Sequence, residues 1–250
     1  MKVAVLVPVY NAAPYVGQAL QSLLRQRDAA QLSIIVVDDG SMDGSPAIVR
    51  GLAAEAPEIA LSELQHGGIS HARNATLKAI PPDADVVTFL DADDISPPGR
   101  LRRDLARFDP GTDFHYGSMR TFRRLDPETL TSIDTSGQVT TRSMQLGAAL
   151  FSAGFIRRVG EFDAALATCE DLDFLLRAFE LRPRHILSGD VALLYRQHDA
   201  NTSRDRAQIR KDFMLMLEKS LKRRKSLGEF EYPPGVFDGM DLTKLGGVVR

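Results

Sequence analysis

The chain has 250 residues, 44% of them hydrophobic, and a formal net charge of −2. This length and composition predict one α/β domain with a small appendage, and the slightly negative charge gives no support to a nucleic-acid-binding protein. A single cysteine, Cys169, excludes an internal disulfide framework and favours a reducing compartment.

Strand and helix patterns alternate over the first ninety or so residues. Apolar runs typical of buried strands lie at 3–7, 33–37, 59–64 and 86–90, and helical patterns lie at 16–24, 45–53 and 69–80. Pro14 is predicted in the first turn of the first helix, and Ser45 as the N-cap of the second, with Pro46 after it. Such alternation predicts a mostly parallel sheet with right-handed crossovers.

The pattern changes after Pro97 and Pro98. A short helix is predicted at 101–108, strands at 114–125 and 130–133, a helix opening at Glu170-Asp171, and a last strand at 191–195. We expect the strands at 114–125 and 130–133 to be antiparallel, less buried, and joined by a turn at Asp126-Pro127-Glu128. Gly147 and Gly154 are predicted to allow a close approach of backbone or ligand.

The segment from 204 to 225 is predicted to be a basic amphipathic helix. Its apolar side chains fall on one face: Ile209, Phe213, Met216, Leu217 and Leu221. Packing of this face on the domain is the favoured interpretation, and peripheral contact with a membrane surface is the alternative. No apolar run reaches the ~20 residues that cross a bilayer, and the N-terminal run is too short for a signal peptide, so we expect a cytoplasmic protein.

Three carboxylates follow the apolar strand at 86–90. Because side chains alternate along a strand, Asp91 and Asp93 are predicted to point the same way and Asp94 the other way. Two carboxylates aimed at one point repel each other unless a cation lies between them, and oxygen ligands suit Mg²⁺ or Mn²⁺. An acidic surface loop without a metal is the ordinary alternative.

Other polar groups follow the neighbouring strands. Tyr10 offers an aromatic face, Asp38 a carboxylate, and the Gly67-Gly68 turn a helix N-terminus followed by Arg73. A nucleoside diphosphate needs such a set: a ring to stack on the base, an acceptor for its imide N–H, and positive charge for the phosphates. Each residue also has an ordinary explanation, as core aromatic, turn residue or surface ion pair.

Together these motifs resemble the family 2 glycosyltransferases, which have the GT-A fold and use nucleotide-linked sugars. The resemblance covers residues 3 to about 200, and the matching segments are 7–11, 36–41, 72–74, 89–94, 159–163, 170–174 and 195–198. It implies a Rossmann-like, mostly parallel sheet flanked by helices, with a small antiparallel sheet and a C-terminal helical tail. The implied domain is 1–203, with a nucleotide-sugar half at about 1–95, an acceptor half at about 96–203, and the tail at 204–250.

The resemblance also implies roles for residues that would bind the donor. Pro8, Tyr10 and Asp38 would hold the nucleobase and ribose. Arg73 would lie near the phosphates, and Asp91 would contact the ribose or the sugar.

The metal and catalytic roles follow from the same resemblance. Asp93, together with Asp91, would bind a Mn²⁺ or Mg²⁺ ion, and His198 would reach the metal or the diphosphate. Asp171 would be the general base, since a base must face the leaving group across the sugar. At the start of a helix, Asp171 is expected to be held ionised by the helix dipole, and helix capping alone is the alternative.

The implied activity is the inverting transfer of a sugar from a nucleoside diphosphate to a hydroxyl of a glycan or lipid-linked acceptor. UDP is the expected nucleotide, and GDP and dTDP are the alternatives. The Gln-x-x-Arg-Trp motif of processive polysaccharide synthases is absent and the chain has no Trp, which favours single addition. His66 stands where many relatives have Asn, so its role is open.

Three other functions would require different residues at these positions or remain as alternatives. A phosphotransferase of the haloacid dehalogenase type would need its nucleophilic Asp after the first strand, where this chain has Tyr10-Asn11. A calcium loop at 39–50 lacks its closing Glu, because Arg50 stands there. A sugar-nucleotide-binding protein without turnover is disfavoured by Asp171 but stays open.

Overall fold

A computed structural model describes residues 1–142, 144–198 and 206–233. Its strands are β1 Lys2–Val9, β2 Gln31–Asp38, β3 Ile59–Glu63, β4 Val86–Phe89, β5 Phe114–Phe122, β6 Thr140–Thr141, β7 Ala149–Ser152 and β8 His185–Arg196. Its helices are α1 Val16–Leu24, α2 Ser45–Glu55, α3 Ile69–Lys78, α4 Arg100–Leu105, α5 Ala153–Val159, α6 Glu170–Glu180 and α7 Arg206–Lys225, with a short 3₁₀ turn, η1, at Leu146–Ala148.

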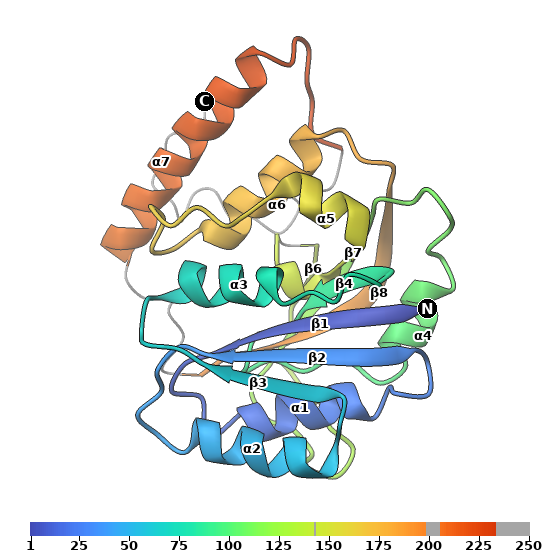
Figure 1. Cartoon of the computed structure of the whole chain (residues 1–250). Helices are drawn as coiled ribbons and strands as arrows, with labels where there is room; N and C mark the ends of the chain where they lie inside the picture. The colour runs from blue at the N-terminus through green and yellow to red at the C-terminus, as the bar shows by residue number, and fades with distance from the viewer. Residues whose placement is uncertain (143, 199–205, 234–250) are drawn as a thin grey trace.

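The strands form one eight-stranded sheet in the order β3-β2-β1-β4-β7-β5-β6, with β8 paired to β5. β3, β2, β1 and β4 pair in parallel, whereas β7 runs antiparallel to both β4 and β5. Helices α1 and α2 cover one face of the parallel half, α3, α5 and α6 cover the other, and α7 packs outside α6 (Figure 1). This is the mostly parallel α/β sheet that the sequence predicted.

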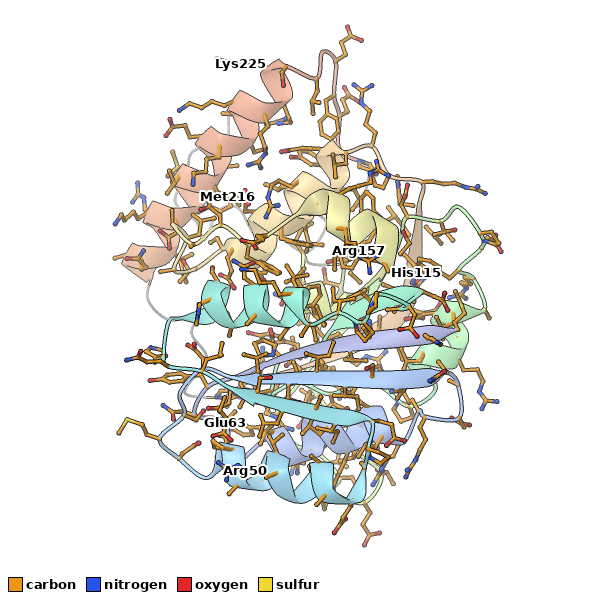
Figure 2. The ribbon with its side chains drawn as sticks, in the orientation of Figure 1. Arg50, Glu63, His115, Arg157, Met216 and Lys225 are labelled. Carbon is orange, nitrogen blue, oxygen red and sulfur yellow. The ribbon has the colours of Figure 1, made fainter. Side chains whose placement is uncertain are left out.

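Burial explains the strand order. Residues 3–9 of β1 and all of β4 are buried, because both strands are apolar except for Thr88 and lie inside the sheet with helices on both faces. Only the first residue of β3, Ile59, is buried, which suits the position of this strand at the edge of the sheet. At this edge Arg50 of α2 pairs with Glu63 of β3, with Nε 3.0 Å from Oε1 (Figure 2). Because both side chains are exposed, this pair contributes little to stability.

The second half departs from the sequence prediction at β5. This strand is almost entirely buried, not less buried, because β7 and β6 lie along one edge and β8 lies along the other. The pairing of β5 with β8 is parallel, and β8 is longer than predicted, starting at His185. The predicted strand at 130–133 is wrong: only an isolated bridge joins Leu125 to Ser132, and β5 pairs instead with Thr140–Thr141.

Several local predictions also need correction. Pro14 lies in a turn before α1, and Ser45 is the first residue of α2, where Gly44 is the N-cap. A Cβ at Gly147 would lie 2.9 Å from Leu193 Cδ1, so the predicted close approach is confirmed there, whereas Gly154 has open space. No helix in the described part of the chain combines the length and apolar character needed to cross a membrane.

Candidate active site

The ends of β1 and β2 bring Tyr10 and Asp38 together. Val9 pairs with Asp38, and the next amide, of Asp39, donates to the carbonyl of Val9 at 2.8 Å. The Tyr10 side chain is exposed, whereas Asp38 is only 1% exposed. Asp38 Oδ1 accepts from the amide of Ser41 at 2.8 Å, but its buried Oδ2 has no hydrogen-bond partner in the described residues. A buried carboxylate oxygen without a donor is costly, so this atom is a candidate acceptor for a ligand N–H.

The neighbouring Asp39, to which the sequence assigned no role of its own, binds the backbone amides that were expected to hold phosphate. Its oxygens accept from the amides of Gly67 and Gly68 at 3.0 and 2.8 Å. His66 Nδ1 lies 2.8 Å from Asp39 Oδ2, and the His66 ring stacks on Tyr10 with centroids 4.2 Å apart. The glycine turn is therefore tied to β2 through a buried carboxylate, and these two amides do not face outward.

The acidic segment 91–94 is a turn and not the end of a strand. β4 ends at Phe89, and the amide of Asp94 donates to the carbonyl of Asp91 at 3.0 Å. The strand alternation on which the prediction for Asp91 and Asp93 depended is therefore absent, and each carboxylate of the turn has a different partner. Asp91 accepts from Arg73 at 2.9 Å, Asp93 lies 2.8 Å from His198, and Asp94 accepts from the amide of Arg196 at 2.9 Å.

Asp93 and His198 form a partly exposed pair. Asp93 Oδ2 and His198 Nε2 are 2.8 Å apart, with 29% and 14% of the side chains exposed. Burial and the negative charge of Asp91 raise the pKa of Asp93, while His198 opposes that rise. The described residues contain no group of three or more His, Cys, Asp or Glu arranged to hold a metal, and Asp93 and His198 are two adjacent donors among them.

Arg196 fixes the acidic turn, and sequence reasoning did not assign it a role. Its Nε donates to the carbonyl of Asp93 at 2.7 Å, and its Nη2 donates to Gln18 Oε1 at 2.8 Å. The guanidinium also lies over the rings of Tyr15 and Phe122, at 5.1 and 4.7 Å from their centroids. These partners are far away in the sequence, so only the matching segment at 195–198 could have pointed to Arg196.

Arg73 links the two halves of the chain. It is 4% exposed, and its Nη2 and Nη1 donate to Asp91 and Glu170 at 2.9 and 2.5 Å. Burial disfavours the charged guanidinium, but Asp91 and Glu170 outweigh that effect and raise the pKa of Arg73. In this structure the Arg73 guanidinium therefore forms a buried bridge between two carboxylates.

Glu170 and Asp171 open α6, as predicted, beside Arg73. Asp171 Oδ1 accepts from the amide of Leu172 at 2.7 Å. Burial raises the pKa of Asp171, Arg73 opposes the rise, and Asp91 adds to it. Burial also raises the pKa of Glu170 to about 7, against the opposing charge of Arg73.

The loop before these acids is held by α7. Asp212, only 1% exposed, accepts from the amides of Ala167 and Thr168 at 3.1 and 2.8 Å and from Thr168 Oγ1 at 3.0 Å. The next residue, Cys169, has a φ of 61°, which a non-glycine residue adopts only when its surroundings enforce it. Burial raises the pKa of the Cys169 thiol to about 12, so this thiol is poorly suited to act as a nucleophile.

The two cavities measured in the described residues lie elsewhere. One, of about 450 Å³, is lined by α1 and α2 residues including Leu24 and Leu52, and the other, of about 260 Å³, lies between Phe179 and Phe230. Neither is lined by a predicted site residue. The candidate site is thus defined by the contacts among its residues and not by a measured cavity. It lies at the carboxyl ends of the parallel strands, where ligands bind in open α/β sheets.

Comparisons with known proteins identify the family and the fold. The family model for glycosyl transferase family 2 matches residues 4–150. A glycosyltransferase of Nostoc described as uncharacterised is 38% identical over 104 residues, covering 41% of this chain and 31% of that protein. The succinoglycan biosynthesis protein ExoO of Rhizobium meliloti is 27% identical over 245 residues, covering 90% of this chain and 69% of that protein.

Two solved structures have the same fold. The mannosyltransferase PcManGT from Pyrobaculum calidifontis, in complex with GDP-Man and Mn²⁺, has a TM-score of 0.65 at 22% identity, over 94% of this chain and 66% of that one. TarS of S. aureus, in complex with UDP-GlcNAc, has a TM-score of 0.67 at 19% identity, over 90% of this chain and 73% of that one. The chain spans less than a third of the length of the first curated relatives that it matches.

Proposed function

The chain belongs to glycosyl transferase family 2, and we propose that it is an inverting, metal-dependent member of that family. It would transfer a sugar from a nucleoside diphosphate, with UDP as the expected nucleotide, to a hydroxyl of a glycan or lipid-linked acceptor. Relatives named for teichoic acid and succinoglycan biosynthesis support a role in the synthesis of a surface polysaccharide.

The observation that carries the proposal is the bridge through Arg73. Its guanidinium bonds to Asp91, on the turn after β4, and to Glu170, the residue before Asp171. The bridge supports a single active site that contains both the acids of the first half and the proposed base of the second half. Buried ion pairs of this geometry are costly to form and to break, so the spacing between the two acidic segments is held firmly.

The nucleotide preference rests on Asp38. Its buried Oδ2 has no partner among the described residues and lies at the same strand ends as the exposed ring of Tyr10. A carboxylate oxygen accepts a hydrogen bond and cannot donate one while ionised, so it suits the imide N–H of uracil and rejects the ring nitrogen of cytosine. Thymine presents the same imide N–H and guanine also presents N–H groups, so dTDP and GDP are the alternatives. Pro8, buried inside β1 at the register of Val37, would complete the base and ribose site through its backbone.

Asp93 and His198 are the residues proposed to hold the metal. A carboxylate oxygen and an imidazole nitrogen 2.8 Å apart, both partly exposed, suit Mn²⁺, and the raised pKa of Asp93 indicates crowded negative charge that a cation would relieve. Bound Mn²⁺ or Mg²⁺ would offset the charge of the leaving diphosphate. Asp91, whose two oxygens accept from Arg73 at 2.9 and 3.2 Å, is better suited to contact the ribose or sugar than to ligate the ion.

Asp171 is the proposed base. Its carboxylate would accept the proton of the acceptor hydroxyl while that oxygen bonds to the anomeric carbon and the bond to the diphosphate breaks. Attack from the face opposite the leaving group inverts the anomeric configuration. The raised pKa of Asp171 increases its strength as a base in the ionised form, and Arg73 and the amide of Leu172 limit the rise.

The proposal is tested by nucleotide binding followed by transfer. Titration calorimetry with UDP, GDP, dTDP and CDP, each with and without Mn²⁺, should give Mn²⁺-dependent binding that is strongest for UDP and weakest for CDP. Asp38→Asn should weaken UDP binding about 10-fold, since it loses a charged acceptor. The matched variant Asp83→Asn, exposed at the opposite ends of the strands, should bind UDP like wild type.

The transfer step needs its own assay. A panel of sugar nucleotides with glycoside and lipid-linked acceptors should give a product whose anomeric configuration, read by NMR, is opposite to that of the donor. Retention of configuration would contradict the proposal. UDP binding with no turnover on any acceptor would instead support the binding protein without catalysis.

A further inference from the structure

Helix α7 has two faces that both carry apolar side chains, which the sequence prediction of one apolar face did not foresee. The inner face packs on α6 through Phe213 and Met216, which are 8% and 1% exposed (Figure 2 labels Met216). Met214 and Leu221 lie on the opposite face and are 47% and 53% exposed. Leu221 was predicted to pack on the domain, and the structure places it outward.

The inner face is fastened by more than apolar packing. Ser220 donates to Glu180 Oε1 at 2.6 Å, and Arg223 donates to Glu180 Oε2 at 2.5 Å and to Asp173 Oδ1 at 3.1 Å. With these contacts and the Asp212 clamp on the loop at 167–168, the helix is part of the domain. The outer face is therefore presented in a fixed orientation.

The outer face combines apolar and basic side chains. With about 100° of rotation per residue, Met214 and Leu221 fall within one third of the helix circumference. The same arc carries four exposed basic residues: Arg210, Lys211, Lys222 and Lys225. One acid, Glu218, lies among them and pairs with Lys222 at 2.6 Å. Two further exposed leucines lie beside the C-terminal end of the helix, Leu181 and Leu227, whose segments are joined by Arg182 donating to the Leu227 carbonyl at 3.0 Å.

Charge is concentrated on this helix. Residues 206–225 contain eight basic and two acidic side chains, whereas the whole chain has a formal net charge of −2, so the rest of the chain is net acidic. In Figure 1, α7 stands outside α6, away from the sheet, and Figure 2 shows Lys225 at its outer end. The molecule thus has one basic outer surface that also exposes large apolar side chains.

We propose that this outer face of α7 docks on the surface of an anionic lipid bilayer. Apolar side chains flanked by Lys and Arg are what an interfacial helix needs: the apolar groups enter the headgroup boundary, and the long basic side chains reach the lipid phosphates. The excess of positive charge favours an anionic surface, and neither cavity described above is lined by residues of this face, which favours a membrane over a protein element that would need a groove.

Docking would also orient the site. Asp212 lies on the inner face of α7 and holds the loop that precedes Glu170 and Asp171, so the membrane-facing surface and the proposed base are connected through one rigid helix. This consequence goes beyond the proposed function, and lipid binding can be measured without any turnover.

The test is co-sedimentation of the full chain with vesicles of phosphatidylcholine alone or mixed with phosphatidylglycerol. We expect binding only to the mixed vesicles, and release by high salt, which screens surface charge. The double variants Met214→Ser/Leu221→Ser and Lys211→Glu/Lys222→Glu should each weaken binding at least about 10-fold.

Matched variants serve as controls away from α7. Ile133→Ser removes an exposed apolar side chain of similar size. Arg25→Glu reverses an exposed charge just after the C-terminal end of α1. Neither variant should change vesicle binding. UDP affinity of all variants should match that of wild type, which separates loss of docking from misfolding and from failure of the proposed function. Equal binding to neutral vesicles, no binding to either, or formation of a dimer through this face in light scattering would overturn the proposal.

Discussion

The two halves of the sheet hold their site residues in different ways. In the parallel half, Tyr10, Asp38 and the acidic turn follow β1, β2 and β4, so the register of neighbouring strands places them together. In the other half, His198 and Glu170, the residue before Asp171, depend on side-chain contacts across long stretches of chain. Arg73 and Glu170 are 97 residues apart, and Asp93 and His198 are 105 apart.

The difference indicates where each function is vulnerable. A site built from strand ends persists as long as the sheet forms, because many backbone hydrogen bonds determine the register. A site held by single side chains loses its geometry when one of them changes. Substitutions in the second half should therefore lower turnover more than nucleotide affinity, and substitutions in the first half should lower affinity.

The largest effect is expected from Asp171→Asn. The amide cannot accept the proton of the acceptor hydroxyl, so transfer should fall by about 10²- to 10⁴-fold while UDP affinity stays nearly unchanged. Steady-state transfer rates and calorimetry check both parts. The exposed Asp109→Asn is the matched control. A variant that transfers at the wild-type rate would remove Asp171 from the mechanism.

Asp93→Ala comes next and tests the point where the two halves meet. Loss of this carboxylate should weaken Mn²⁺-dependent UDP binding by at least about 10-fold, since a direct ligand is removed. A chelator should lower UDP affinity of wild type to the level of the variant and leave the variant unchanged. The exposed Asp28→Ala should respond to the chelator as wild type does. Equal affinity with and without Mn²⁺ in wild type would contradict the metal site.

A smaller effect is expected from Asp212→Asn, which alters the clamp on the loop before the base. The amide keeps the size of the side chain but loses the charged acceptor for the amides of Ala167 and Thr168, so kcat should fall about 10-fold. The donor KM should not change, because the nucleotide contacts lie on the other half. Glu218→Gln on the outer face of the same helix is the control. A rise in donor KM with constant kcat would contradict the expectation that substitutions in the second half lower turnover more than nucleotide affinity.

The smallest effect concerns pH and Glu170. Burial raises its pKa from 4.5 to about 7, so the folded protein holds this proton more tightly than the unfolded chain does. The stabilising contribution of the protonated group is complete below its unfolded pKa and is lost as the pH rises through about 7. The Tm of wild type should therefore fall, relative to that of Glu170→Gln, by a few degrees across this interval. A constant difference in Tm would indicate that the pair with Arg73 keeps Glu170 ionised throughout.

Much of the parallel half could be predicted from the sequence, for a physical reason. The side chains of runs such as 3–7 and 86–90 are almost all apolar, so the sequence alone predicts that these runs are buried strands. It also shows that polar residues follow them. The start of α6 at Glu170 was likewise readable from the helical spacing after it.

What the sequence did not determine depends on partners far along the chain. β5 is buried because β8 pairs with it, Arg73 is a bridge because Glu170 reaches it, and Leu221 is exposed because Phe213 and Met216 fix the rotation of α7. Composition and periodicity determined which segments form strands and helices and which residues carry the chemistry. Only the tertiary structure decided how those residues pair, because desolvation and ion pairing depend on distances that local sequence does not encode.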